Sequence, residues 1–380
     1  MKQKICFVIG NYNNGGGTER VTSQVANGLV DRGYNVAILS IGKGLNPHFD
    51  TRECIELYEA DSLKSFPFNK KLKSNIIINI FNKIFFRVWC IIRVVVITHG
   101  LKQKLKKIRA DVVIAVDIEC YRYIDYGRKK LGYKAIGWEH FCLDSRNSPG
   151  VNYSRFLAAK HAARIVVLGD KDKEAYIKKY PKANNIQRIY NPIAYDISRN
   201  VDVVNNKVVI SAGRYTYQKG FDMLIDSWAR ISDKVLDWEL RIFGDGEDRE
   251  KLQEKIYHYN LKNIRLCGYS KNLDDEFNKA SVFALSSRYE GWGLVLLEAQ
   301  AKGLPCISYD CKQGPSQIID NGVNGFLVSP NNVDEFADKL LMLIQDEKLR
   351  VSFSKKSQKD LYRFNTDNVL DQWDDLLKSI

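Results

Sequence analysis

Two glutamates in the segment "SRYEGWGLVLLE" (287–298), Glu290 and Glu298, lie eight positions apart. Glu290 directly precedes a Gly-Trp-Gly loop, whereas Glu298 lies in an apolar run that predicts a buried helix. Burying an ionised carboxylate is costly unless cations or hydrogen-bond donors pair with it. A carboxylate at Glu298 can accept two hydrogen bonds from neighbouring hydroxyls, such as those of a ribose. The alternative is that Glu298 pairs with a nearby cation for structural reasons alone.

The segment "GRYTYQKG" (213–220) supplies two cations at the start of a predicted helix. Arg214 and Lys219 flank a loop there, and two cations at a helix N-terminus suit a diphosphate group. Two solvated surface cations are the alternative. Tyr269, in "CGYS" (267–270), ends another predicted strand, where its ring can form a wall for a flat base. Ordinary packing is the alternative for this tyrosine.

A glycine-rich loop, "NYNNGGGTERV" (11–21), follows the first apolar run and opens a predicted helix. Gly16 and Gly17 let the backbone approach a ligand closely, and the free N–H groups of a helix N-terminus bind phosphate. A flexible turn is the alternative. The loop lacks the third glycine of the dinucleotide-binding pattern G-x-G-x-x-G, so it is not that motif.

The chain holds one D-x-D sequence, Asp170 and Asp172 in "LGDKDKEAY", a pattern that could hold a divalent metal. Its neighbours are lysines, and it opens a predicted helix. We therefore interpret it as a helix N-cap with solvated charges, and we expect no metal site and no cofactor.

The elements that must position these residues are strands and helices in alternation. Short, continuous apolar runs predict strands buried on both faces, and their alternation with helical patterns predicts parallel βαβ units. At 380 residues the chain is expected to form about two domains. The fold class is therefore α/β, with two Rossmann-like domains facing each other across a cleft, ligands beyond the carboxyl ends of the strands, and a linker at 191–207. The predicted strands are 4–9, 35–40, 111–117, 134–140, 164–169, 186–192, 207–214, 238–246, 263–270, 281–287, 305–310 and 325–330.

The composition indicates a folded protein with one strongly basic segment. The chain is 45% hydrophobic and 27% charged, and its eight cysteines form no C-x-x-C pair, which favours a reduced cytosolic compartment. Of the net charge of +13, nearly all lies between Asp61 and Asp111, where twelve Lys or Arg and no acidic residue occur. Such a block implies a polyanionic partner, either nucleic acid or an anionic membrane surface. No nucleic-acid-binding motif accompanies it, so nucleic acid is not expected.

The centre of the basic segment, residues 75–97, predicts an amphipathic helix. Lys83, Arg87 and Arg93 gather with the asparagines on one side of a helical wheel, and apolar residues fill the rest. A basic amphipathic helix lies in a membrane interface and does not cross it. We consider two interpretations equally: the helix contacts an anionic membrane surface, or its apolar face packs on its own domain. A transmembrane helix is the least favoured alternative.

These motifs together resemble a known family. The segments "GGTER", "GRYTYQKG", "FGDGE", "EGWGLVLLEA" and "GPSQIIDNGVNGFLV" occur in the order found in family-4 glycosyltransferases of the GT-B fold. The resemblance covers nearly the whole chain, and the paired glutamates with seven intervening residues are its most specific part. Trp292 stands where Phe is commoner, which keeps an aromatic ring at that position.

The resemblance implies a retaining, metal-independent enzyme that transfers a hexose or an N-acetylhexosamine from a nucleotide diphosphate sugar, with UDP favoured. The expected acceptor is a bacterial polysaccharide, such as O-antigen or capsule, or a glycan linked to polyprenyl diphosphate. Residues 1–192 would bind the acceptor and include the basic segment 69–109, and residues 207–364 would bind the nucleotide sugar. Residues 365–380 would form a helix that crosses back to the N-terminal domain.

The resemblance also implies roles for single residues around the donor sugar. Glu290 and the amides of Gly293 and Leu294 would hold this sugar near its anomeric carbon. His140, in "WEH" (138–140), would lie beside the sugar, although a lone histidine is more often structural.

The remaining roles concern the nucleotide. Arg214 and Lys219 would neutralise the diphosphate, Glu298 would hold the ribose, and Gly16 and Gly17 would approach the donor phosphate and sugar.

Two other functions compete with this hypothesis. A nucleotide-sugar epimerase of the same architecture would need neither a lipid acceptor nor an amphipathic helix. A non-catalytic nucleotide- or carbohydrate-binding protein predicts loss of Glu290 or of the cation pair, and both are present. For the leading hypothesis we expect a cytoplasmic location, peripheral on the inner face of the cell membrane.

Overall fold

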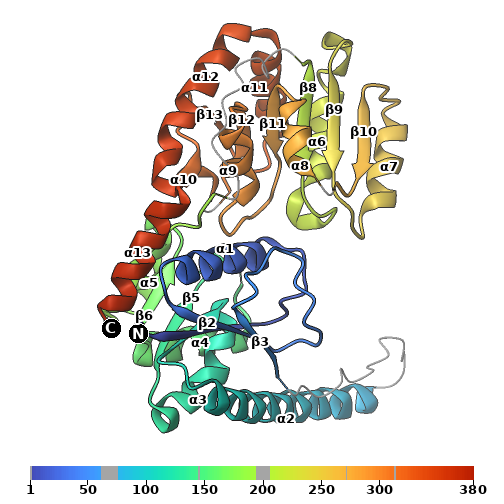
Figure 1. Ribbon diagram of the computed structural model, residues 1–380. Helices are drawn as coiled ribbons and strands as arrows, with labels where there is room; N and C mark the ends of the chain where they lie inside the picture. Colours follow the sequence, from blue (N-terminus) through green and yellow to red (C-terminus); the bar gives the residue numbers. More distant parts are fainter. Residues whose placement is uncertain (1, 61–75, 144–145, 194–205, 271, 312–313) are drawn as a thin grey trace.

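The computed structural model describes the chain except residues 1, 61–75, 144–145, 194–205, 271 and 312–313, and only the backbone of residues 76–91 and 360. Within this part, the chain forms two α/β domains, each built on a parallel sheet (Figure 1). The predicted fold class is therefore confirmed. The predicted linker falls mostly outside the described residues.

The N-terminal domain contains a seven-stranded parallel sheet with the order β3-β2-β1-β4-β5-β6-β7 in the described chain. Its central strands are buried on both faces, as a parallel sheet covered by helices requires. The strands are β1 (Lys4–Ile9), β2 (Asn35–Ser40), β3 (Glu56–Glu59), β4 (Val112–Val116), β5 (Lys134–Trp138), β6 (Arg164–Val167) and β7 (Ile186–Arg188). The helices are α1 (Gly17–Asp31), α2 (Ile76–Ile108), α3 (Tyr121–Leu131), α4 (Pro149–His161) and α5 (Asp170–Lys179).

The C-terminal domain contains a six-stranded sheet with the order β10-β9-β8-β11-β12-β13, again counted in the described residues. Its strands are β8 (Val208–Ala212), β9 (Glu239–Phe243), β10 (Ile264–Gly268), β11 (Val282–Leu285), β12 (Cys306–Tyr309) and β13 (Gly325–Val328). Its helices are α6 (Phe221–Ala229), α7 (Arg249–His258), α8 (Leu273–Asn278), α9 (Leu294–Ala301), α10 (Pro315–Ile318), α11 (Val333–Gln345) and α12 (Glu347–Asp360).

Each sheet has a switch point where the strand order reverses. In the N-terminal sheet it lies between β1 and β4, and in the C-terminal sheet it lies between β8 and β11. Ligands of open α/β sheets bind in the crevice outside the carboxyl ends of the strands at such a point. The loops after these four strands are therefore the places where binding residues are expected.

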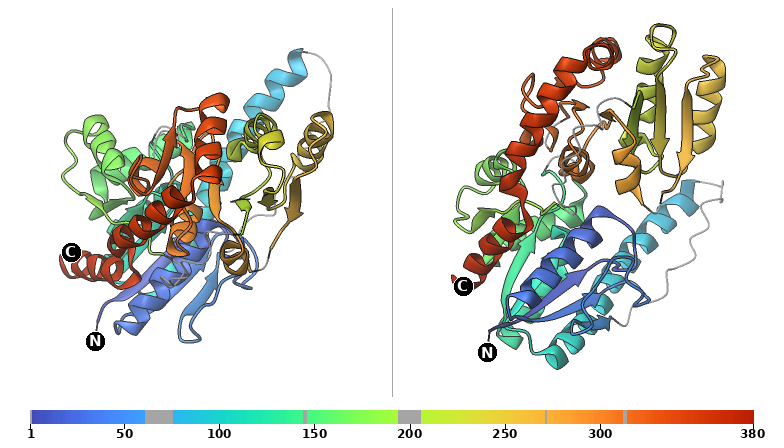
Figure 2. Two further views of the ribbon diagram at one scale, coloured as in Figure 1. Left: turned by 90° about the horizontal axis from the view of Figure 1, so that it is seen from above. Right: turned by 45° about the horizontal axis from the view of Figure 1, so that its top comes forward.

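The last helix, α13 (Thr366–Lys378), returns to the N-terminal domain and packs beside α1 (Figure 2). Leu370 and Trp373 are buried, and the Trp373 ring contacts Trp138 with 4.8 Å between ring centroids. Gly28 permits the close approach of the two helices, because a Cβ atom there would lie 2.2 Å from Leu370 Cδ1. The chain thus crosses between the domains twice.

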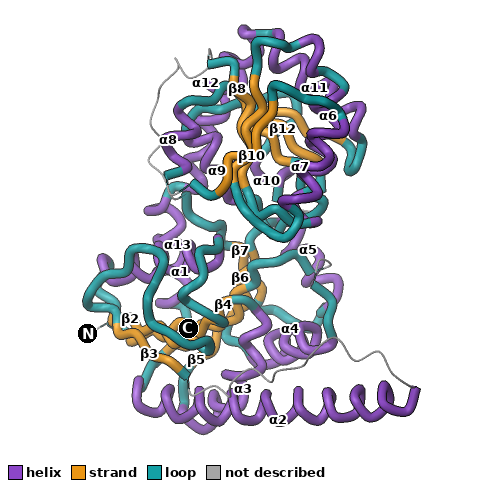
Figure 3. Tube along the Cα trace, turned by 90° about the vertical axis from the view of Figure 1, so that its right-hand side faces the viewer, coloured by secondary structure: helices purple, strands orange, loops and turns teal. Residues whose placement is uncertain are grey.

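Helix α2 covers one side of the N-terminal domain (Figure 3). In its second half, Ile97, Leu101 and Leu105 are buried against the domain. Arg93 is exposed, while the side chains of Lys83 and Arg87 and the start of the basic segment, 69–75, lie outside the described residues. No helix in the described chain has the length and apolar content that crossing a membrane requires.

We predict that Trp373→Ala destabilises the protein by about 3–5 kcal/mol, the usual cost of removing a buried tryptophan side chain. Thermal unfolding and urea unfolding, monitored by circular dichroism, measure the change. Tyr362→Ala is the control, because Tyr362 precedes the same helix but is exposed. Equal stability of the two variants would show that packing of α13 does not stabilise the N-terminal domain.

Candidate active site

The loop after β11 carries Glu290, whose side chain is only 6% exposed. Its Oε1 atom accepts hydrogen bonds from Lys219 Nζ at 2.6 Å and from Ser287 Oγ at 2.5 Å. The buried carboxylate is therefore compensated by a cation from the loop after β8. The structure thus brings together two predicted site residues that lie far apart in the sequence.

Close packing of these two loops brings Lys219 to Glu290. The 3₁₀ turn η3 (Tyr217–Lys219) ends at Gly220, which has φ +62°. A Cβ atom at Gly220 would lie 2.2 Å from the Ser286 carbonyl oxygen, so only glycine fits without displacement. Arg288 ties the loops further, since its guanidinium donates to both carboxylate oxygens of Asp222, at 2.8 and 2.6 Å.

Helix α9 begins at this site, and its first turn points its free N–H groups there. Gly293 precedes the helix with φ +84°, and Leu294 is its first residue. A Cβ atom at Gly17, the first residue of α1, would lie 2.9 Å from Leu294 Cδ1. The N-termini of α1 and α9, one from each domain, therefore lie close together, with Gly16 at the N-cap of α1.

Glu298 lies within α9 and is 3% exposed. Its carboxylate forms an ion pair with Arg20 of α1, which belongs to the other domain. Sequence reasoning did not single out Arg20, although it lies in the quoted "GGTER" motif. A buried carboxylate needs a partner, and Arg20 is that partner for Glu298. Because a carboxylate has several acceptor positions, this pair is compatible both with a structural role and with ligand binding.

His140 follows β5 and is buried, with its ring 4.4 Å from that of Trp138 between centroids. Burial lowers the pKa of His140 to about 3, so its imidazole is neutral at physiological pH. The loop of His140 touches the loop of Glu290. A Cβ atom at Gly291 would lie 2.3 Å from the His140 carbonyl oxygen, and Cys142 Sγ donates to the Glu290 carbonyl oxygen at 3.0 Å.

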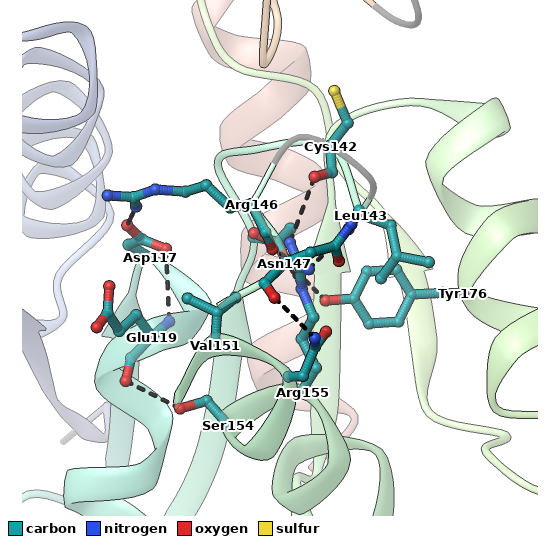
Figure 4. A network of polar contacts seen from close by, with 12 residues as sticks. Asp117, Glu119, Cys142, Leu143, Arg146, Asn147, Val151, Ser154, Arg155 and Tyr176 are labelled. Carbon is teal, nitrogen blue, oxygen red and sulfur yellow. Dashed lines mark hydrogen bonds and ion pairs between the residues drawn. The ribbon is translucent and has the colours of Figure 1, made fainter. Parts of the chain in front are cut away.

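A buried arginine shapes the loop that carries His140 (Figure 4). Arg155, from α4, donates to Glu139 Oε2 at 2.8 Å and to the carbonyl oxygens of Leu143 and Arg146, both at 2.7 Å. Tyr176 donates its hydroxyl to the same Glu139 oxygen at 2.6 Å. No local sequence pattern indicated this network, because its members come from separate elements.

Arg214 and Tyr269 lie at the edge of the site. Arg214 is exposed. Burial raises the pKa of the Glu19 carboxyl, and the charge of Arg214 is one of the influences that lower it. Tyr269 is also exposed, and its hydroxyl lies 3.3 Å from Nε2 of His48 in the other domain. The alternative of ordinary core packing for Tyr269 is therefore wrong, whereas its ring stays accessible to a ligand.

The interpretation of the D-x-D sequence needs correction. Helix α5 starts at Asp170, its N-cap is Gly169, and no side chain makes a capping hydrogen bond. Asp172 is buried, so its charge is not solvated. Asp170 pairs with Arg188 at 3.0 Å, and its negative charge is favourable in the first turn of a helix. Among the described side chains, no three His, Cys, Asp or Glu are grouped so as to hold a metal ion.

Two family descriptions match the chain, one for each half. Residues 15–196 match Glycosyltransferase Family 4, and residues 196–360 match Glycosyl transferases group 1. The two matches meet within the predicted linker.

Individual proteins are similar over the whole chain. An uncharacterized glycosyltransferase of Haemophilus influenzae is 30% identical over 377 residues, which cover 99% of this chain and 100% of the relative. The amylovoran biosynthesis glycosyltransferase AmsD of Erwinia amylovora is 27% identical over 98% of this chain and 99% of its own length. The structure of Anabaena HepE in complex with UDP and glucose has the same fold, with a TM-score of 0.78 and 18% identity over 100% of both chains. With these matches on both halves, the chain belongs to the family-4 glycosyltransferases of the GT-B fold.

Proposed function

We propose that the chain is a retaining hexosyltransferase that moves a hexose or an N-acetylhexosamine from a UDP-sugar to a polysaccharide or lipid-linked glycan. One observation carries this proposal: residues of both domains lie together at the carboxyl ends of the two sheets. Lys219, Glu290 and the N-terminus of α9 come from one domain, and His140 and the start of α1 come from the other. These groups supply cations, hydroxyl-binding acceptors and free N–H groups in one place, which is the set that a nucleotide diphosphate sugar needs.

The donor part of the proposal is supported by two of the similar proteins. The Anabaena structure holds UDP and glucose, and the Erwinia relative is named for amylovoran biosynthesis. The identities of the nucleotide, sugar and acceptor of this chain are carried over from them as part of the proposal.

The chemistry that these residues would perform is stabilisation of separating charges. When the glycosyl–phosphate bond breaks, the diphosphate gains negative charge and the sugar gains positive charge. Lys219 and the N–H groups of α9 are preorganised donors for that anion, so they need little rearrangement at the moment of reaction, and the exposed Arg214 adds a further cation. In this proposal these groups take the role that a divalent metal has in other transferases.

Retention without a covalent intermediate requires the acceptor hydroxyl to attack the face of the anomeric carbon from which the diphosphate leaves, and the hydroxyl proton passes to the leaving diphosphate. We assign Glu290 to the hydroxyls of the donor sugar, because Lys219 and Ser287 leave further acceptor positions on its carboxylate. We assign His140 to a neutral hydrogen bond with the same sugar. A neutral imidazole does not compete with Lys219 for the diphosphate.

The membrane part of the proposal rests on α2. This helix carries Lys83, Arg87 and Arg93 on a segment without acidic residues. A lipid-linked acceptor is presented at the cytoplasmic leaflet, where basic residues are attracted to anionic lipid by about 1 kcal/mol each.

We predict that Lys219→Ala and Arg214→Ala each lower kcat by about 10²–10³-fold, the usual effect of removing one preorganised stabilising group. Release of UDP from UDP-sugars measures the change. Lys255→Ala is the matched control, because Lys255 belongs to the same domain but pairs with Asp226 at 2.7 Å, which lies in neither loop. Wild-type kcat in both site variants would contradict the assignment.

We also predict that activity survives EDTA, since cations and N–H groups of the chain stabilise the leaving diphosphate. The double variant Asp170→Asn with Asp172→Asn should keep wild-type kcat, although the burial of Asp172 makes some loss of stability expected. Complete loss of activity in EDTA, restored by Mn²⁺ or Mg²⁺, would instead indicate a metal-dependent transferase.

For the membrane surface, we predict binding to vesicles that contain anionic lipid, weak binding to neutral vesicles, and partial release at 1 M salt, where the Debye length is about 3 Å. Changing Lys83, Arg87 and Arg93 together to Glu should lower binding and lower activity on a lipid-linked acceptor more than activity on a soluble one. Co-sedimentation and the ratio of the two activities are the measurements.

The control for this triple variant makes the same charge change elsewhere. Lys348, Lys355 and Lys356 are exposed on α12 of the other domain, and changing them to Glu should leave both measurements as in wild type. If the two triple variants behave alike, α2 is a packed element of its domain and not a membrane contact.

A further inference from the structure

Asp117 occupies the N-terminal switch point, opposite the donor loops. It follows β4 directly, and β4 and β1 are the strands between which the N-terminal sheet reverses its order. In the C-terminal domain, the loops at the corresponding point carry Lys219 and Glu290. In the N-terminal domain, the loop after β1 carries Gly16 and Gly17, and the loop after β4 begins at Asp117. These two loops flank the crevice at the switch point.

The backbone of Asp117 is held in an unfavourable conformation. Its φ is +63° and its ψ is 121°, a combination outside the left-handed helical region and rare for a residue with a side chain. Such strain persists where the surrounding structure enforces it, and it gathers at functional sites. A capping role alone gives little reason for it, because the hydrogen bond that Asp117 accepts from the Glu119 N–H is long, at 3.4 Å.

The carboxylate of Asp117 forms a pair with a guanidinium that is itself fixed (Figure 4). Arg146 Nη1 donates to Asp117 Oδ2 at 2.6 Å, and the Arg146 guanidinium lies 4.3 Å from the centroid of the Phe141 ring. Buried Arg155 also binds the Arg146 carbonyl oxygen. Asp117 is 21% exposed and Arg146 is 43% exposed, so a ligand can reach both groups.

The charges around Asp117 select the kind of ligand. Burial, followed by the nearby charge of Glu139, raises the pKa of Asp117 to about 6, and Arg146 offsets only part of this. At neutral pH the group is therefore mainly a poorly hydrated carboxylate. It accepts hydrogen bonds from hydroxyls, and its oxygens keep acceptor positions beyond the contacts with Arg146 and the Glu119 amide.

We propose that Asp117 and Arg146 form the acceptor-sugar site, in which the Asp117 carboxylate accepts hydrogen bonds from hydroxyls of the acceptor and Arg146 donates to its oxygens. This inference rests on the proposed transferase function and specifies the acceptor side of the same crevice. His140 follows the adjacent strand β5, whose Trp138 pairs in register with Val116, so the acceptor site borders the position assigned to the donor sugar. His140 Nε2 is buried and has no hydrogen-bond partner among the described atoms.

Two substitutions separate this role from a structural one. Asp117→Asn keeps the size of the side chain, its capping oxygen and its tolerance of positive φ, but it removes the charge. Asp117→Gly also removes the side chain while it relieves the backbone strain. Asp125→Asn is the matched control, because Asp125 lies on α3 of the same domain and pairs there with His161 and Arg128.

The experiment uses octyl glycosides of glucose, galactose, mannose and N-acetylglucosamine as acceptor probes, in the presence of UDP. Saturation-transfer NMR reports binding, and UDP release from UDP-sugars gives the acceptor KM. We expect both Asp117 variants to raise the KM about 10–100-fold, the effect of losing one or two charged hydrogen bonds, and to lose the NMR signal. The dissociation constant of UDP, measured by calorimetry, should stay at the wild-type value in all three variants.

Unchanged acceptor KM and NMR signal in Asp117→Asn would overturn the proposal, as would an equal weakening of UDP binding, which would place Asp117 on the donor or in the fold. A separate result would contradict the proposed transferase function: the wild-type protein releases no UDP from any of the UDP-sugars. In that case, a glycoside NMR signal that disappears in Asp117→Asn still supports a sugar site, and one that persists contradicts it.

Discussion

Two buried carboxylates must each keep a cation, and this requirement determines how the loops of the two domains meet. Glu290 takes Lys219 from its own domain, and Glu298 takes Arg20 from the other. Removing one partner of a buried ion pair costs about 3–5 kcal/mol, because the remaining charge loses its compensation. The loop after β8 and the start of α1 are therefore both held by charge against the segment that contains α9, which is where the donor is proposed to bind.

Most of the fold could be predicted from the sequence, because a strand buried on both faces needs a continuous apolar run and leaves a clear pattern. Strand β3 (Glu56–Glu59) was missed, since it lies at the edge of its sheet and carries polar residues. Glu290 and Lys219 were singled out because each lies in a short segment with its own pattern, and the structure places the two side chains in contact. Arg20 and Arg155 were missed because their partners are distant in sequence, and no local pattern encodes such pairing.

Glycine illustrates a further limit of sequence reasoning. Gly16 and Gly17 were predicted to let the backbone approach a ligand, whereas the structure shows Gly220 and Gly291 letting one part of the chain approach another. A Cβ atom at either of the latter two would meet a carbonyl oxygen at 2.2 or 2.3 Å. Both uses look alike in a sequence, since each needs only the absence of a side chain. The spatial neighbours decide between them, and those depend on the domain arrangement.

Aromatic packing adds to the interdomain ion pair in holding the two domains together. Tyr190, Trp292 and Phe364 contact one another with ring centroids 4.8–5.8 Å apart, and burial of each apolar side chain contributes about 1.5–3 kcal/mol. Arg20 is partly exposed, whereas Glu298 is buried, so separating the pair would leave the Glu298 carboxylate without its cation. Tyr190 and Phe364 flank the two places where the chain passes between the domains. The aromatic contacts therefore lie beside both crossings, and the pair of Arg20 with Glu298 fixes how the loops of the two domains meet at the site.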